Sequence, residues 1–141
     1  MSTSSRFAIA IHTLAVLGYL KKHGVERATS QQIAKSVNTN AVVIRNLLRA
    51  LKRAGLVEAK EGKDGGISLA RPPAKISLRD VYAAVEEGGI LCLNKNPELK
   101  ACPVSREMSG ILHPIFSEVD KAVAKTLQCR NLKSLVDLIS T

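Results

Sequence analysis

The sequence predicts a mainly α-helical protein with a small β-hairpin wing: a winged helix-turn-helix followed by a long C-terminal helix. Two helical segments flank a tight turn within residues 29–54, and two alternating segments flank a glycine-rich turn within 56–71. After Pro103, apolar residues recur at helical spacing. With 141 residues, 45% of them hydrophobic, the chain is long enough for one compact domain with an attached arm.

A first helix is expected from Ser4 or Ser5 to about Lys22, where Gly24 provides a stop signal. Its apolar run, residues 7–20, is shorter than the roughly 20 residues needed to span a bilayer, so it should be a buried core helix. The start, MSTSSRF, lacks the features of a secretory signal. We therefore expect a cytoplasmic protein with reduced thiols and no membrane partner.

The segment that follows has the pattern of a helix-turn-helix. Thr29 and Gln32 have capping-box spacing at the start of a short helix, and residues 38–40 (Asn-Thr-Asn) supply a turn. The next helix places four apolar residues on one face, which should be buried: Ile44, Leu47, Leu48 and Leu51.

A hairpin and a fourth helix come next. LVEAK (56–60) and ISLAR (67–71) both alternate, and the turn between them, EGKDGG, is rich in glycine and charge. Pro72 and Pro73 then interrupt the chain, and Ser77 with Asp80 predicts a capped helix over 77–88. The turn lacks the ending of a phosphate-binding loop, so it is better explained as the tip of a wing.

Charge divides the chain into two halves. Residues 1–75 contain 13 Lys and Arg against four acids, whereas residues 76–141 contain eight of each sign. The whole net charge of +9 therefore lies in the first half, where it would attract a polyanion. We predict a DNA-binding domain over 1–75 and a dimerisation and signal-sensing region over 76–141.

The exposed face of the third helix carries side chains suited to double-stranded DNA. Arg45 can contact guanine and Asn46 adenine through paired hydrogen bonds in the major groove. Thr39 and Asn40 stand at the helix start, where free amides favour a phosphate. Further predicted backbone contacts come from cations on this helix and around it: Arg49, Lys35, Lys60 and Lys63.

Two other classes of function compete with a DNA reader. A basic winged helix could also serve as an adaptor that binds RNA or protein. An enzyme is not expected, because no nucleophile–base–acid set, phosphate loop or metal triad appears in the sequence. His12, His23 and His113 are interpreted as structural residues.

The long helix predicts a homodimer. A neutral second half with one main amphipathic helix cannot bury that helix's apolar stripe alone, so a second subunit should cover it. The residues expected at this contact are Ile111, Ile115, Val119 and Val123. Pro114 should kink the helix or mark its true start.

Several of these segments together resemble the Rrf-two family of bacterial winged-helix repressors, which includes iron–sulfur and nitric-oxide sensing members. The resemblance rests on SQQIAKSV, on RALKRAGLVEAKEGKDGGISLARPPAKISLRDVYAAVEEG, and on CPV before the long helix. SVNTNAVVIRNLL is most similar to the subgroup without a cluster. The resemblance implies a homodimer on a pseudo-palindromic operator, joined by the long helices, with wings flanking it.

Two residues depart from the family pattern. Glu61 stands where many relatives have an arginine, and Ile67 replaces a frequent tyrosine. Both departures weaken the expectation that the wing contacts DNA as it does in those relatives.

The three cysteines leave alternatives open. Cys102 precedes Pro103 at the start of the long helix, a position that favours the thiolate, and Cys92 could resolve an oxidised Cys102. Their spacing does not match a three-cysteine cluster motif, so an iron–sulfur cluster using Cys129 or His113 is disfavoured. No cofactor and no metal site is therefore expected. A thiol switch, a small-ligand pocket and simple burial of the cysteines remain as hypotheses.

Overall fold

The computed structural model describes residues 3–86 and 88–140. Within these residues it contains six α-helices, one short 3-10 helix and one two-stranded antiparallel sheet. In chain order the elements are α1 (Thr3–Lys22), α2 (Ser30–Val37), α3 (Ala41–Arg53), β1 (Val57–Lys60), β2 (Gly66–Leu69), η1 (Pro73–Lys75), α4 (Leu78–Val85), α5 (Pro103–Gln128) and α6 (Leu132–Val136). This arrangement confirms the predicted winged helix-turn-helix with a long C-terminal helix.

Helix α1 is the central element of the core. The helix contributes three buried residues to the core, Ala10, Leu14 and Leu17, and it contacts α2, α3, α4 and α6. His12 Nε2 lies 3.0 Å from Ser36 Oγ, which links α1 to α2. At the far end, His23 Nδ1 lies 2.9 Å from the carbonyl oxygen of Tyr19, and Gly24 adopts a φ of 82°. The predicted end of the first helix is therefore confirmed.

Both predicted capping boxes are present. The backbone N–H of Gln32 donates to Thr29 Oγ1 at 3.1 Å, and Gln32 Oε1 accepts from the Thr29 N–H at 2.8 Å. In α4, Ser77 and Asp80 make the same reciprocal pair, each at 3.0 Å. Because each box satisfies two otherwise unpaired amides, it fixes where its helix begins.

The predicted hairpin forms, and its strands pair with Val57 opposite Leu69 and Lys60 opposite Gly66. Ala28 pairs with Ile67 on the other side of β2 through hydrogen bonds of 2.8 and 3.0 Å. This close approach requires glycine at position 66, where φ is 142° and a Cβ would lie 2.9 Å from the Ala28 carbonyl oxygen. The hairpin is thereby held against the segment that leads into α2.

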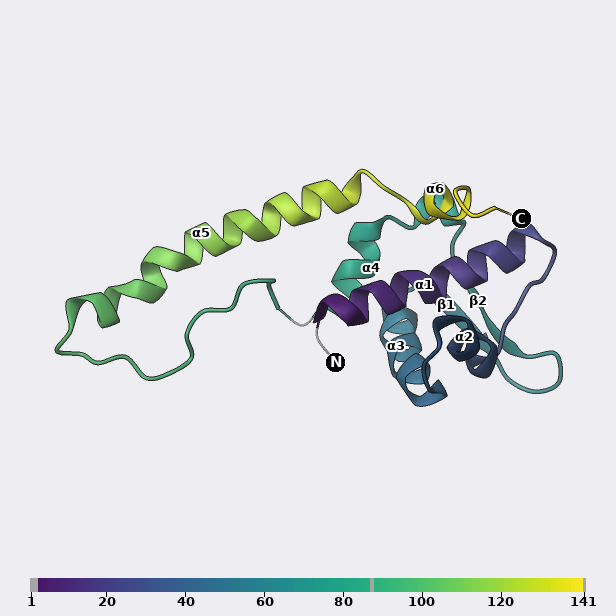
Figure 1. The fold of residues 1–141 in the computed structure, drawn as a ribbon, viewed down its shortest axis with the longest axis horizontal. Helices are drawn as coiled ribbons and strands as arrows, with labels where there is room; N and C mark the ends of the chain where they lie inside the picture. The colour runs from purple at the N-terminus through teal and green to yellow at the C-terminus, as the bar shows by residue number, and fades with distance from the viewer. Residues whose placement is uncertain (1–2, 87, 141) are drawn as a thin grey trace.

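Helix α5 forms an arm on the rest of the molecule; residues 88–102 run outward beneath it to the tip of the arm, and α5 returns from there (Figure 1). The helix begins at Pro103 and continues through Pro114, so the prediction that Pro114 marks its true start is wrong. Proline is tolerated at the first helical position because its missing N–H would have had no helical partner. The predicted fourth helix is shorter than expected, because α4 ends at Val85 and Glu86 is extended.

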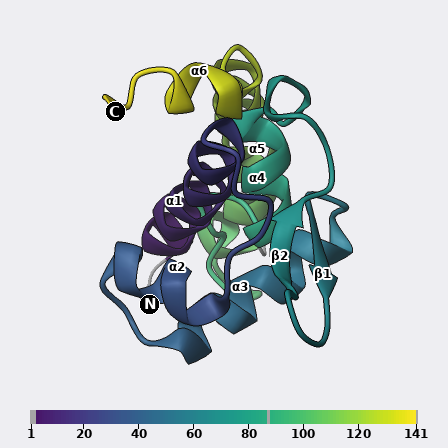
Figure 2. The ribbon, with the colours of Figure 1, turned by 90° about the vertical axis from the view of Figure 1, so that its right-hand side faces the viewer.

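The chain returns to the N-terminal half after α5. Leu132 and Val136 of α6 are buried in the same core cluster as Leu14 and Val81. The Leu132 N–H donates to the Ile76 carbonyl at 2.8 Å. In Figure 2, α6 lies at the opposite end of the molecule from α2 and α3, so it does not cover those two helices. Packing thus continues across the predicted domain boundary, and the assignment of separate roles to 1–75 and 76–141 stays a prediction.

Candidate nucleic-acid interface

Helix α3 is fixed by a buried face and a capped start. Ile44, Leu47, Leu48 and Leu51 are all buried, as the sequence predicted. Asn40 Oδ1 accepts a hydrogen bond from the Val43 N–H at 3.1 Å, which makes Asn40 the N-cap. The opposite face is therefore held toward solvent, and Arg45, Asn46 and Arg49 are exposed there.

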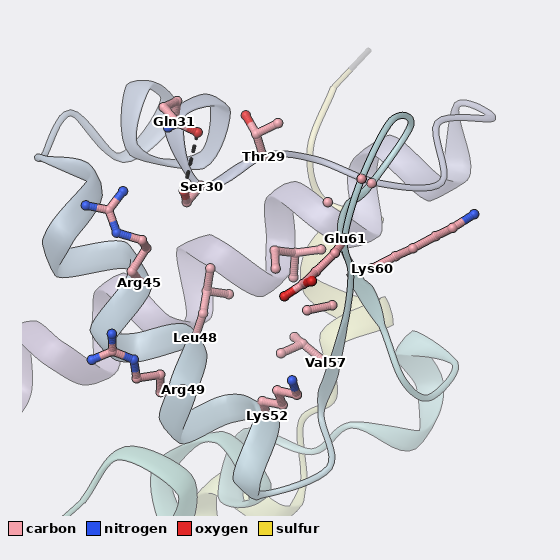
Figure 3. A pocket seen from close by; sticks show the side chains of 15 residues that line it. Thr29, Ser30, Gln31, Arg45, Leu48, Arg49, Lys52, Val57, Lys60 and Glu61 are labelled. Atoms are coloured by element: carbon pink, nitrogen blue, oxygen red, sulfur yellow. Dashed lines mark hydrogen bonds between the residues drawn. The ribbon is translucent and has the colours of Figure 1, made fainter.

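A groove of about 620 Å³ separates α3 from the hairpin and the start of α2. Figure 3 shows α3 on one side of it and the hairpin on the other. The groove is lined by four cations and one acid: Arg45, Arg49, Lys52, Lys60 and Glu61. This surplus of positive charge beside an exposed helix provides the electrostatic setting for a polyanion.

The hairpin presents different charges on its two faces. Side chains alternate along β1, so Val57 and Ala59 belong to one face and Glu58 and Lys60 to the other, and Glu61 directly follows the strand. In Figure 3 the Glu61 carboxylate points into the groove, whereas the Lys60 side chain extends away from α3. The wing therefore places a negative charge inside the groove.

The predicted DNA-contacting residues divide into two groups. Arg45, Arg49 and Lys60 line the groove, and Lys35, Thr39, Asn40, Asn46 and Lys63 do not. Lys35 is exposed near the end of α2, and Lys63 is exposed at the hairpin turn. Asn40 Oδ1 accepts the capping hydrogen bond. In this side chain, the Nδ2 amide is the group that can donate a hydrogen bond to a phosphate.

The groove residues that were not predicted to contact DNA include Ser30, Gln31 and Lys52. Ser30 and Gln31 form the first turn of α2, where backbone N–H groups lack helical partners. Thr29 marked this turn as a helix start in the sequence. Its proximity to α3 and the wing, however, depends on the tertiary fold.

Helix α5 has an exposed apolar stripe, which we call the α5 stripe. It consists of Val104, Met108, Ile111 and Ile115, whose exposed fractions are 63%, 39%, 52% and 50%. Val119 and Val123, the other two predicted dimer contacts, are half-buried. Steps of four, three and four residues keep the stripe on one side of the helix, as in helices that pair with another helix.

The junction of α1, α4 and α5 contains a half-buried tyrosine. Phe7 and Tyr82 make an edge-to-face contact, with ring centroids 5.2 Å apart. Burial raises the pKa of Tyr82, and the carboxylates of Glu86 and Asp120 raise it further. Asp120 Oδ1 also accepts a hydrogen bond from the Ile90 N–H at 3.2 Å, which ties residues 88–90 to α5.

Two of the three cysteines flank α5, and Cys92 lies in the segment that precedes it. Cys102 is its half-buried N-cap residue and lines a hollow with Leu93 and Met108. Cys92 lines a second hollow with His113, and Cys129 caps the other end of the helix. Among the described residues, no three His, Cys, Asp or Glu side chains are grouped closely enough to hold a metal ion. In the same part of the chain, no helix is both long and apolar enough to cross a membrane.

A helix-turn-helix with an exposed basic third helix and an adjoining hairpin defines a winged-helix DNA-binding protein. Residues 3–138 match the family model Rrf2, described as an iron-dependent transcriptional regulator. The chain belongs to the Rrf2 family, which confirms the resemblance inferred from its sequence motifs. It is accordingly a DNA-binding transcriptional regulator.

Individual relatives agree with this assignment. YwnA of Bacillus subtilis, named as an HTH-type transcriptional regulator, is 36% identical over 135 residues, covering 95% of this chain and 96% of YwnA. A crystal structure described as a DNA-binding protein is also 36% identical, with a TM-score of 0.71, and the match covers 92% of this chain and 97% of that one. The oxidized form of CymR from Staphylococcus aureus is 21% identical, with a TM-score of 0.66 over 100% of both chains, and shares the fold.

Proposed function

We propose that this protein is a homodimeric, sequence-specific transcriptional repressor that binds a palindromic operator and responds to thiol oxidation or a small ligand. Such a regulator would work in the cytoplasm, where bacterial DNA is found. The main support for sequence-specific DNA binding is the exposed polar face of α3. Arg45, Asn46 and Arg49 lie on that face, opposite a buried apolar face.

The α5 stripe supports the homodimer. Four apolar side chains, each at least 39% exposed, lie along an arm that extends away from the core. A second copy of the same helix would remove them from water, and two-fold pairing places the same patch on both subunits. Two copies of α3 would then face two related half-sites, as in other dimeric helix-turn-helix proteins.

The position of Cys102 supports a signal that acts through α5. Its backbone oxygen accepts the first helical hydrogen bond, from the Arg106 N–H at 3.0 Å, and its side chain borders a hollow of about 340 Å³. Oxidation of the thiol, or a ligand in the hollow, would change the start of the helix that carries the stripe. CymR, which shares this fold, has a structure of its oxidized form.

The test of DNA reading begins with selection of bound fragments from genomic DNA, followed by affinity measurements on the recovered site and on a shuffled duplex. Arg45→Ala should lose about 1–3 kcal/mol of discrimination, while its affinity for the shuffled duplex falls much less. Lys121→Ala removes an exposed cation from α5 and serves as the control, with wild-type discrimination expected. Equal binding of the wild type to every duplex would reject sequence-specific reading and favour the adaptor hypothesis.

A further inference from the structure

We propose that Val42 reads thymine methyl groups in the major groove, and so sets part of the sequence preference of α3. This inference rests on the proposed function, because it assumes that α3 enters the major groove. Val42 would then add an apolar contact to the exposed face of α3, whose other predicted DNA contacts are polar.

Val42 differs from the other aliphatic residues of α3. Its exposed fraction is 55%, whereas Ile44, Leu47, Leu48 and Leu51 are each at most 7% exposed. Burial on folding therefore gives no reason for a branched apolar side chain at this position. Valine is also a weaker helix former than alanine, so helix propensity does not explain it either.

Position 42 lies on the face that carries the polar readers. At 100° per residue, residues 45, 46 and 49 fall within about 60° of residue 42, and the buried Leu51 falls on the opposite side. Because the Asn40 cap fixes the first turn, Val42 occupies the second helical position. The N-terminal residues of a recognition helix are those that meet base edges.

Thymine offers the matching chemistry. Among the base-edge groups exposed in the major groove, the C5-methyl of thymine is the apolar one. Small apolar side chains contact it there. Valine in a helix strongly prefers one χ1 rotamer, so both methyl groups are presented in a fixed place at little entropic cost. We expect the thymine to neighbour the bases read by Arg45 and Asn46, because these residues lie one turn from Val42.

The experiment replaces single thymines of the selected operator with deoxyuridine, which removes only the C5-methyl. For the wild type, one or two positions in each half-site should lose about three- to fivefold in affinity, corresponding to ~0.8 kcal/mol for one buried methyl-sized group. Val42→Ala should bind the thymine operator correspondingly more weakly and should lose the sensitivity at those positions. Circular dichroism checks that the variant keeps its helix content.

Val25→Ala is the matched control, because Val25 is 44% exposed but lies outside α3, in the segment between α1 and α2. It should keep the wild-type deoxyuridine profile. A wild type that is indifferent to every thymine methyl, or a Val42→Ala variant with an unchanged profile, overturns the inference while leaving sequence-specific reading intact. Failure of the proposed function is distinguishable, since the wild type would then show no preference for any duplex and the inference would fall with it.

Discussion

Arg49 Nη1 donates a hydrogen bond to Asn46 Oδ1 across one turn of α3, at 3.1 Å. Recognition of adenine by Asn46 requires that same oxygen to accept from the base while the amide nitrogen donates. We expect the Arg49 guanidinium and the base to compete for Asn46 Oδ1. We expect that Arg49, on turning toward a phosphate, would release Asn46 to read its base.

This relationship predicts different effects for the two residues. Asn46→Ala should abolish the preference at one base position in each half-site, at a cost of about 1–3 kcal/mol. Arg49→Ala should weaken binding to all duplexes and reduce the slope of log affinity against log salt by about one per subunit, yet preserve that base preference. Affinities for operators substituted at each position, measured over a salt series, separate the two outcomes. Equal loss of base preference in both variants would contradict the release of Asn46 by Arg49.

Glu61 should oppose DNA binding, because its carboxylate faces the groove that contains Arg45 and Lys52. Glu61→Gln removes one negative charge with little change in shape. We expect tighter binding to any duplex by about 0.2–1 kcal/mol, the usual range for an exposed charge interaction, with the gain fading at high salt.

The matched control for this charge is Glu58→Gln. Glu58 lies on the same hairpin but on the other face of β1, and it is exposed. It should change affinity less than Glu61→Gln at every salt concentration. Similar gains in affinity from both variants would mean that the net charge of the protein determines the effect, and that the inward direction of the Glu61 side chain does not.

The fold could be predicted largely from local signals. The capping pairs Thr29–Gln32 and Ser77–Asp80 identified two helix starts, and both formed as expected. Alternation on either side of a glycine-rich turn identified the hairpin. These features depend on residues three or four apart or on a short turn, so the chain specifies them before tertiary packing.

The missed features depend on contacts between distant segments. Helix α6 has only five residues, and its burial against α1 depends on the path of the chain after α5. The inward direction of Glu61 and the membership of Gln31 in the groove likewise follow from how the hairpin packs. The apolar pattern of α5 predicted a single stripe, but the structure divides it into the exposed α5 stripe and half-buried residues such as Val119 and Val123.

The α5 stripe should govern oligomeric state. Ile111→Asp combined with Ile115→Asp places two charges where apolar side chains would meet in a dimer, so we expect a monomer by sedimentation equilibrium. Both residues are at least 50% exposed in the single chain, and the monomer should therefore stay folded. Lys121→Asp introduces the same residue at an exposed site off the stripe and should remain dimeric. A dimeric double variant would show that another surface joins the subunits.

Asp137 should make the attachment of α6 sensitive to acid. A hydrogen bond of 2.7 Å from Lys133 Nζ is the main cause that lowers the pKa of Asp137, and Lys22 of α1, at 3.5 Å, adds to it. Because the folded pKa lies below the unfolded one, this stabilisation is complete above the unfolded value of about 4 and is lost as pH falls through the folded value.

Thermal unfolding measured at a series of pH values, from neutral to acidic, tests the role of Asp137. The Tm of the wild type should exceed that of Asp137→Asn at neutral pH, and the gap should close below about pH 4. Asp64→Asn, a change at the exposed hairpin turn, controls for general acid effects. A gap between wild type and Asp137→Asn that is independent of pH would exclude the ion pairs as its cause.

Cys102 should be the thiol through which oxidation releases DNA. Diamide removes two electrons and two protons from a pair of thiols to form a disulfide, and it is itself reduced to the hydrazine. Helix α5 has 26 residues and is about 39 Å long, so Cys102 and Cys129 of one chain stand too far apart to pair. Cys92 or the second subunit must therefore supply the other thiol.

We expect diamide to release operator DNA from the wild type and from Cys129→Ser but not from Cys102→Ser, with dithiothreitol restoring binding. Peptide mapping of the oxidised wild type then identifies the second cysteine, and the mass under non-reducing conditions shows whether the bond joins two chains. Release from Cys102→Ser at the wild-type diamide concentration would exclude Cys102 as the trigger. Loss of release in Cys92→Ser as well would assign Cys92 as its partner, because Cys92 lies in the loop that leads into α5.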